Sequence, residues 1–225
     1  MTRVAQLLRK GLSVGPLLFR LAKMNGKGSA DIVNFVCENN VIGALQIKGE
    51  LSRLAELIAE RRPTRILEIG TARGGTLCLL SRLAAPDATI ISVDLPGGAF
   101  GGGYEWFYIP IFKTFVRQQQ KLHLIRGDSH STEIQSSVRN VLGQEKLDLL
   151  FIDGDHSYDG VKQDFENYRP LVAPGGIIAF HDIAEHTLQS CQVSRLWNEL
   201  KSQYKTEEII ENRQQGWAGI GVVYV

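Results

Sequence analysis

The sequence predicts an α/β fold in which helices cover both faces of a mostly parallel sheet, the doubly wound arrangement. Apolar, strand-like runs alternate along the chain with helical patterns, and 44% of the 225 residues are hydrophobic. A single core can grow to roughly 250 residues, so this length suits one large domain with an appendage. We therefore divide the chain into an N-terminal helical segment, 1–45, and a main domain, 46–225.

The first thirty residues have the pattern of basic amphipathic helices. They contain Lys and Arg but no acid, and one helical face carries Val4, Leu7, Leu8 and Leu12. Pro16 is a favourable first residue for a second helix, whose apolar positions would be Leu17, Leu18 and Leu21. Three interpretations are open: helices that pack on the domain or a sister subunit, peripheral membrane contact by residues 1–25, and a targeting sequence. An apolar stripe most often faces a core, which favours packing, and we expect a homo-oligomer.

The remaining elements follow in order along the chain. A helix from Gly49 to Arg62 is stopped by Pro63. Five apolar strands are expected at 65–69, 89–94, 122–126, 147–152 and 176–181. Helical patterns separate them near 74–84, 110–120, 131–142 and 158–171. Two further strand-like runs, 206–210 and 217–225, have only a short connection, so we expect a C-terminal antiparallel hairpin and a seven-stranded sheet.

The composition narrows the class of partner. A formal net charge of +1 gives no reason to expect nucleic acid, which usually needs a basic surface, so we expect a small-molecule substrate. No apolar run approaches the roughly 20 residues that cross a bilayer, and the N-terminus has no clean signal peptide. We expect a cytoplasmic protein. Cys37, Cys78 and Cys191 include no C-x-x-C pair and are expected to be reduced core thiols.

A strand that breaks into small residues and then a helix predicts a ligand-binding turn after residue 69. Glycines let the backbone lie against a ligand, and the helix start offers free N–H groups. The spacing Gly70-x-x-x-Gly74-Gly75 matches neither dinucleotide folds nor phosphate loops. Glu68 adds negative charge that would repel a pyrophosphate but attract an amino group or a sulfonium. The ligand is therefore expected to be cationic.

The second strand ends in Asp94, whose two oxygens can accept hydrogen bonds from both hydroxyls of a ribose. In these two motifs, Glu68-Ile-Gly-Thr-Ala-Arg-Gly74 and Asp94, the chain resembles the class I S-adenosylmethionine-dependent methyltransferases, from about residue 45 to the end. The resemblance implies a Rossmann-like methyltransferase fold and S-adenosylmethionine as cofactor. It implies cofactor contacts by Glu68, Gly70, Thr71, Ala72, Gly74, Asp94 and Leu95 and, after the third strand, by Asp128 near the adenine and Ser129.

Polar residues also follow the fourth and fifth strands. The fourth is followed by Asp153-Gly-Asp-His156, and the fifth ends in His181-Asp182. Because these strand ends are adjacent in such a sheet, Asp153, His181 and Asp182 are expected to converge. Two carboxylates and an imidazole suit Mg²⁺ or Mn²⁺ and, with the nitrogen ligand, also Zn²⁺ or Fe²⁺. The oxygen-rich balance favours magnesium or manganese.

This pattern resembles the metal-dependent O-methyltransferases of the catechol and caffeoyl-coenzyme A type. Asp153 matches their first acid, His181-Asp182 replace their Asp-Asn pair, and His156 stands where they carry a lysine base. The segment is closer to a bacterial branch of sugar and natural-product O-methyltransferases and cephalosporin-hydroxylase-like proteins. The resemblance implies methyl transfer to a hydroxyl of a sugar, phenol or natural product, with Asp153 and His156 as catalytic residues.

Other interpretations of these residues remain. Asp153 could cap a helix or contact the cofactor without a metal, and His181 could be a core histidine. The chain could be a cofactor-binding accessory protein without catalysis; a nucleotide-binding oxidoreductase is disfavoured because G-x-G-x-x-G is missing. Residues 96–110, rich in glycine and aromatics, are expected to form a lid over the ligand, the alternative being a disordered surface loop.

Overall fold

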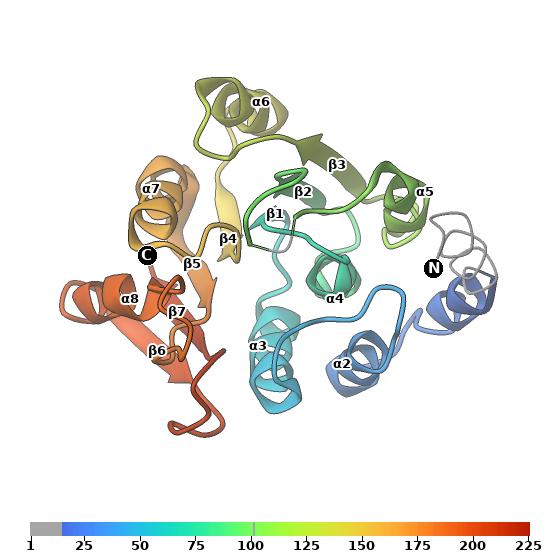
Figure 1. Cartoon of the computed structure of the whole chain (residues 1–225). Helices are drawn as coiled ribbons and strands as arrows, with labels where there is room; N and C mark the ends of the chain where they lie inside the picture. Colours follow the sequence, from blue (N-terminus) through green and yellow to red (C-terminus); the bar gives the residue numbers. More distant parts are fainter. Residues whose placement is uncertain (1–14, 101) are drawn as a thin grey trace.

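The computed structural model describes residues 15–100 and 102–225, which form a seven-stranded sheet with helices on both faces (Figure 1). The strand order is β3-β2-β1-β4-β5-β7-β6. The first five strands are parallel: β1 (Arg65–Ile69), β2 (Thr89–Asp94), β3 (Lys121–Arg126), β4 (Leu147–Ile152) and β5 (Val172–His181). The predicted doubly wound fold is confirmed.

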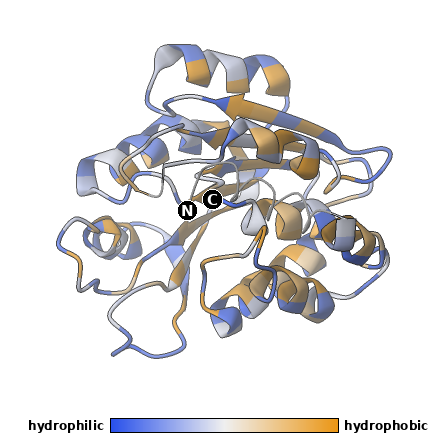
Figure 2. Cartoon of the chain, turned by 45° about the vertical axis from the view of Figure 1, so that its right-hand side comes forward, coloured by the Kyte–Doolittle hydropathy of each residue, from blue (hydrophilic) through white to orange (hydrophobic). Residues whose placement is uncertain are grey.

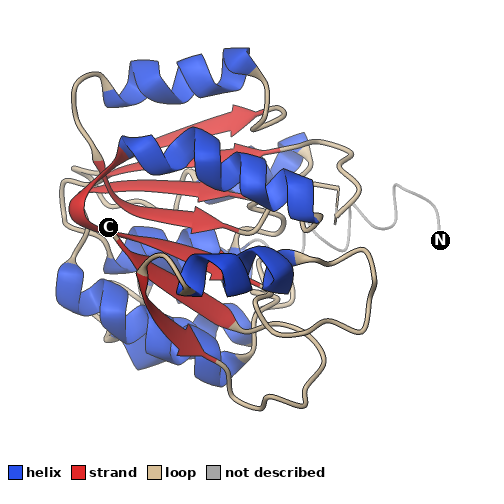
Figure 3. Ribbon diagram, turned by 90° about the vertical axis from the view of Figure 1, so that its left-hand side faces the viewer, coloured by secondary structure: helices blue, strands red, loops and turns tan. Residues whose placement is uncertain are grey.

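The C-terminal hairpin is also confirmed. β6 (Lys205–Ile209) and β7 (Ile220–Tyr224) pair antiparallel, and β7 lies between β5 and β6, antiparallel to both. Seen from the side, the sheet lies between two layers of helices (Figure 3). The strands are mostly hydrophobic, whereas the helices combine hydrophobic and hydrophilic faces (Figure 2). This difference is expected for parallel strands that are buried on both sides.

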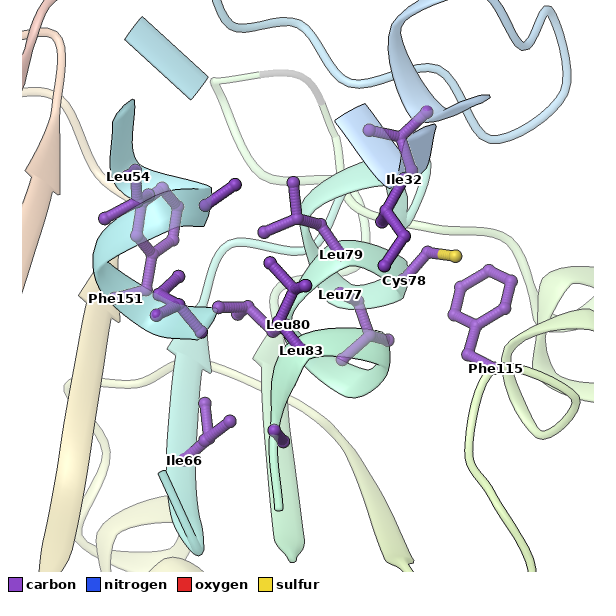
Figure 4. Close-up of a cluster of buried hydrophobic side chains, with 14 of the residues drawn as sticks. Ile32, Leu54, Ile66, Leu77, Cys78, Leu79, Leu80, Leu83, Phe115 and Phe151 are labelled. Carbon is purple, nitrogen blue, oxygen red and sulfur yellow. The ribbon is translucent and has the colours of Figure 1, made fainter. Parts of the chain in front are cut away.

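One core cluster lies between the sheet, α3 (Lys48–Arg61), α4 (Gly75–Leu83) and α2 (Ser29–Cys37), which packs on α3 and α4. In Figure 4 Leu54 of α3 lies beside Phe151 of β4, and Leu80 of α4 and Ile66 of β1 belong to the same cluster. The opposite face carries α6 (Thr132–Leu142), α7 (Tyr158–Tyr168) and α8 (Val193–Lys201) on a second cluster. Two 3₁₀ turns, η1 (Trp106–Tyr108) and η2 (Arg169–Leu171), precede α5 (Ile109–Phe112) and β5.

The N-terminal segment packs on the first of these clusters where it is described. Residues 15–22 are helical, with Leu17 and Leu21 buried in this cluster, while Leu18 is 38% exposed. The first expected helix, with Val4 to Leu12, lies outside the described residues. The boundary at residue 45 stays a prediction. Within the described ranges, no helix has both the length and the apolar character needed to cross a bilayer.

The expected helix over 110–120 is wrong, because α5 ends at Phe112. Beyond it the chain forms turns, and Gln120 closes the last of them by accepting a hydrogen bond from the Arg117 N–H at 2.8 Å. The Gln120 amide, which is buried, also donates to the carbonyl oxygens of Ser81 and Ala85. Those contacts fix a compact turn before β3. Conversely, α8 is a helix that the sequence analysis does not predict, although its apolar positions have helical spacing.

Candidate active site

A pocket of about 540 Å³ opens at the carboxyl ends of β1 to β5, where the fold class predicts a ligand. Its volume lies within the roughly 300–1,000 Å³ of small-molecule sites. Most of the predicted site residues line it: Gly70, Thr71, Ala72, Asp94, Leu95, Asp128, Ser129, Asp153, His156, His181 and Asp182. Glu68 and Gly74 do not. One cavity therefore contains both the proposed nucleoside contacts and the proposed metal ligands.

The turn after β1 is built around Gly70, which has φ +86°. A Cβ at this position would lie 2.0 Å from the carbonyl oxygen of Asp153, so only glycine fits. The Gly70 N–H donates to the Val93 carbonyl, and the Asp153 N–H donates to that of Ile69. Gly74, at φ +82°, is the N-cap of α4 and lies against the ring of Phe112. The turn is thus joined to both neighbouring strands.

Glu68 lies beneath this turn and is completely buried. Its Oε2 accepts a hydrogen bond from the Thr71 hydroxyl at 2.7 Å, and its Oε1 has no hydrogen-bond partner. Burial raises the pKa of the Glu68 carboxyl well above its usual range. Burial thus favours the neutral form of the Glu68 carboxyl, which does not line the pocket, and the charge that Glu68 is expected to present to the ligand stays a prediction.

Asp94 is buried at the end of β2 and organises two loops. Its Oδ1 accepts from the Thr71 N–H at 2.9 Å, and its Oδ2 accepts from the Tyr104 N–H at 2.6 Å. Oδ1 also accepts a longer hydrogen bond from the Ala72 N–H at 3.4 Å, so it is Oδ2 that keeps a second lone pair for a hydroxyl group of a ligand. Gly103 passes close to this carboxylate, since a Cβ there would lie 2.8 Å from Oδ2.

The segment expected to be a lid has two parts. Gly98, Ala99, Phe100 and Gly103 line the pocket. Tyr104 and Tyr108, by contrast, are buried and belong to the core cluster around Phe112. Tyr104 and Tyr108 therefore have mainly a packing function, whereas Phe100 lines the pocket. A closing motion of this segment stays a prediction.

Asp128 and Ser129 follow β3 and lie on the same pocket wall. The Asp128 side chain is 54% exposed, and its Oδ1 accepts from the His130 N–H at 2.9 Å. The Ser129 hydroxyl donates to the buried carboxylate of Asp164 at 2.6 Å. Asp128 is thus free to contact a ligand, whereas Ser129 is held by α7.

The ends of β4 and β5 bring two aspartates and two histidines together. His181 Nδ1 lies 3.1 Å from Asp153 Oδ1 and 3.4 Å from Asp182 Oδ2. His156 Nδ1 lies 3.0 Å from Asp182 Oδ2, and its Nε2 lies 3.5 Å from Asp153 Oδ1. Ligand atoms of Asp153, His181 and Asp182 all lie within 4.8 Å of one another. The predicted convergence of these three side chains is therefore present in the structure.

The two histidines and two aspartates of this cluster shift one another's pKa values. Burial alone would lower the pKa of His156, but hydrogen bonds to Asp153, Asp182 and Cys191 raise it to about 12. The pKa of His181 is raised to about 10, against burial, by the same two aspartates. Burial would raise the pKa values of Asp153 and Asp182, and the histidines lower both. Without a bound cation, His156 thus keeps its proton at neutral pH.

The aspartates are oriented by residues that sequence reasoning missed. Gln46 donates to Asp153 Oδ2 at 2.9 Å and accepts from the Thr76 hydroxyl. The Ala218 N–H donates to Asp182 Oδ1 at 3.0 Å. Each aspartate therefore has one oxygen anchored and the other directed at the histidines. Gln46 is separated from Asp153 by 107 positions, and no local pattern marks this pairing.

Comparison with known proteins agrees with this geometry. Residues 67–183, just over half of the chain, match a family described as "Methyltransferase domain". The chain belongs to this methyltransferase family. The match runs from β1 past the end of β5, so it includes every strand end that lines the pocket.

Sequence relatives and solved structures extend the comparison. The uncharacterized protein y4gI of Sinorhizobium fredii is 30% identical over 135 residues, which are 58% of this chain and 14% of that protein. This methyltransferase domain spans 14% and 55% of the two curated relatives it matches. An O-methyltransferase from Bacillus cereus, solved in complex with S-adenosylhomocysteine (SAH), has a TM-score of 0.60 at 18% identity, covering 88% of this chain and 90% of its own.

A second solved structure is the O-methyltransferase TomG from Streptomyces achromogenes, involved in tomaymycin synthesis and solved in complex with S-adenosylmethionine (SAM). It has a TM-score of 0.56 at 19% identity, covering 91% of this chain and 88% of its own. At these identities the two structures establish the fold of the domain and nothing finer.

Proposed function

We propose that the protein is a SAM-dependent O-methyltransferase that acts on a hydroxyl group of a small molecule, with a divalent metal held by Asp153, His181 and Asp182. The observation that carries this proposal is the single pocket at the carboxyl edge of the sheet. It joins the glycine turn and Asp94 on one side to the aspartate-histidine cluster on the other. Methyl transfer needs donor and acceptor in one such space.

The turn side of the pocket fits a phosphate-free nucleoside. Gly70 brings bare backbone to the pocket wall, and Asp94 Oδ2 has a free lone pair. No lysine lines the pocket among the described residues. Glu68 would act indirectly, by holding the Thr71 hydroxyl. When bound, SAM would supply the methyl group as a sulfonium.

The opposite side fits a hard divalent cation such as Mg²⁺ or Mn²⁺. Two carboxylates and an imidazole supply oxygen and nitrogen donors at short mutual distances. Gln46 and Ala218 fix the second oxygen of each aspartate, as supporting residues around metal sites usually do. A metal here would lower the pKa of an acceptor hydroxyl so that it can attack near neutral pH.

His156 is the proposed proton acceptor. Its ring stacks on Phe100, with centroids 5.1 Å apart and an interplanar angle of 14°, which fixes the imidazole on the pocket wall. Because Asp153 and Asp182 stabilise its charged form, His156 takes up a proton readily but must first release the one it holds. A cation beside the two aspartates favours that release by opposing the charge on the imidazole.

Thermal-shift screening tests cofactor binding. SAH is expected to raise the melting temperature and NAD is not, because a ligand stabilises the folded state that binds it. Stabilisation by NAD alone would reject the proposal. Release of SAH in the presence of a panel of catechols, phenols and sugar diols then separates an enzyme from a cofactor-binding accessory protein, which would bind SAH and show no turnover with any acceptor.

Isothermal titration tests the metal. Mg²⁺ or Mn²⁺ is expected to give a binding isotherm with the wild type, and Asp153→Ala is expected to abolish it, because the variant removes the carboxylate that contacts both histidines. Glu105→Ala, at an exposed carboxyl that does not line the pocket, is the matched control. Equal heats for the wild type and Asp153→Ala would reject this metal site.

A further inference from the structure

A buried thiol lies beside the aspartate-histidine cluster and has no part in the proposed methyl transfer. Cys191 precedes α8 and is buried. Single ligand atoms of His156, Asp182 and Cys191 all lie within 4.8 Å of one another. The expectation that Cys191 is only a core thiol therefore omits its polar surroundings. Cys37 and Cys78 belong to no such group among the described residues.

We propose that His156, Asp182 and Cys191 form a binding site for a thiophilic divalent cation of the zinc class. A thiolate, an imidazole and a carboxylate are the three ligand types that Zn²⁺ takes in proteins, and three protein ligands leave a fourth position open. A thiolate is a poor ligand for Mg²⁺, which prefers oxygen. The site is therefore distinct in chemistry from the oxygen-rich set of Asp153, His181 and Asp182.

The three ligands are held in place by hydrogen bonds outside the set. The Ala218 N–H binds Asp182 Oδ1 and leaves Oδ2 directed at His156 Nδ1, 3.0 Å away. The Gln192 N–H donates to the backbone oxygen of His156 at 2.7 Å, which joins the residue after Cys191 to the histidine. Such contacts fix both the distance and the direction of the ligand atoms.

The two ring nitrogens of His156 have separate surroundings, as a metal-bound histidine requires. Nδ1 faces Asp182, and Nε2 lies 3.5 Å from Asp153 Oδ1. A histidine that binds a metal through one nitrogen usually directs the N–H of the other at a carboxylate or a carbonyl. Asp153 would then orient His156, while Asp182 and Cys191 complete the coordination.

Both cation sets contain Asp182, so a cation at one competes for this carboxylate with a cation at the other. A zinc-class ion on His156 Nδ1 would also displace the proton that Asp182 stabilises there, and Cys191 would lose its thiol proton. Binding therefore releases protons to the buffer. Binding of the cation requires no methyl transfer, so the site can be tested with neither cofactor nor acceptor present.

Cobalt(II) is the probe, because it replaces zinc in such sites and absorbs light when a thiolate is bound to it. Reduced, metal-free protein is titrated with Co²⁺ under anaerobic conditions. We expect a thiolate-to-cobalt charge-transfer band in the near ultraviolet that saturates and that Zn²⁺ abolishes, whereas Mg²⁺ weakens it only in large excess, by competing for the shared Asp182. Cys191→Ser is expected to lose the band and to bind Zn²⁺ at least about tenfold more weakly.

Cys37→Ser is the matched control, since Cys37 is half-buried in α2 and belongs to no candidate set. It is expected to keep the band and the Zn²⁺ affinity of the wild type. Circular dichroism of Cys191→Ser checks that the fold is retained; if it is not, Asp182→Asn with the same readout takes its place. Cobalt bound to the wild type without a charge-transfer band, or a band that survives in Cys191→Ser, would overturn the inference. The first of these results would leave the oxygen-rich site of the proposed function intact.

Discussion

The strongest prediction concerns Glu50, a charged residue of α3 that is only 1% exposed. Its Oε1 accepts hydrogen bonds from the Glu211 N–H at 3.1 Å and from the Gln215 side chain at 2.8 Å, and its Oε2 accepts from the Gly219 N–H at 2.9 Å. These bonds fasten the 210–219 loop to α3. The same loop supplies the Ala218 N–H to Asp182. Glu50 is therefore a positioning residue for the candidate active site.

The expected loss in the free energy of unfolding depends on which of the hydrogen-bond donors to Glu50 can be hydrated instead. In Glu50→Gln, the amide oxygen can keep the bond from Gly219, which is buried, while the amide NH₂ faces Glu211 and Gln215, which are exposed or half-buried and can be hydrated. We expect a loss of about 1–2 kcal/mol, since hydrogen bonds to charged groups contribute about 1.5–3 kcal/mol each. Glu50→Ala also leaves the Gly219 N–H unpaired, so we expect about 3–5 kcal/mol.

Urea unfolding followed by circular dichroism measures both losses. Glu56→Gln is the matched control, because Glu56 is on the same helix with its side chain 55% exposed and paired with Arg53 at the surface. It is expected to unfold at the wild-type urea concentration. If Glu50→Ala unfolded like Glu56→Gln, or if the order of the two Glu50 variants were reversed, the reasoning from hydration would be refuted.

Three further predictions concern the glycine turn after β1, the loss of stability at low pH, and the exposed edge of the pocket. Gly70→Ala should weaken SAH binding by at least about 100-fold in calorimetry, because its Cβ would lie 2.0 Å from a backbone oxygen. Gly97→Ala, with φ +74° and no atom near its Cβ, should bind normally, and equal losses in both would contradict the steric argument. Burial would raise the pKa of Glu208, but hydrogen bonds from three neighbours lower it from 4.5 to about 2. The ionised Glu208 therefore stabilises the folded state fully above pH 4.5, and this contribution is lost as the pH falls toward 2. Glu208→Gln should flatten this slope in urea unfolding, and an unchanged slope would refute it. Trp217→Ala should weaken acceptor binding about tenfold, because Trp217 lines the pocket and is 42% exposed, whereas Trp106→Ala, outside the pocket, should not.

The sheet could be predicted from the sequence because parallel strands are buried on both faces and read as continuous apolar runs. The run at 65–69 and its neighbour at 89–94 match β1 and β2 in full. The turns could not be predicted in the same way. The helix expected over 110–120 stops at Phe112, and the turn before β3 is held by the Gln120 side chain, which binds the carbonyl oxygens of Ser81 and Ala85 that no local pattern brings near it.

The residues of the candidate site also fall into those that the sequence can predict and those that it cannot. Asp94, Asp153 and Asp182 could be located in advance, because each directly follows or ends a strand and the topology assigns it to one edge. Gln46 and Glu50 could not, because their partners lie more than a hundred positions away and depend on how α3 packs. The burial of Glu68 could not be predicted either. The residue type is visible in the sequence, but the burial that raises the pKa of its carboxyl depends on how the turn folds over it.

The geometry of Asp182 links the stability of the C-terminal loop to the chemistry of the pocket. Asp182 and Ala218 both have left-handed backbone conformations, with φ of 61° and 62°, and a hydrogen bond joins them. Such conformations cost on the order of 1–3 kcal/mol each and persist only where the surroundings enforce them. Here the enforcement comes from Glu50, through the neighbouring Gly219. Loss of the Glu50–Gly219 bond should therefore release Asp182 first, so cation affinity should fall in Glu50→Ala even at urea concentrations far below the unfolding midpoint, whereas Glu50→Gln, which keeps this bond, should retain it.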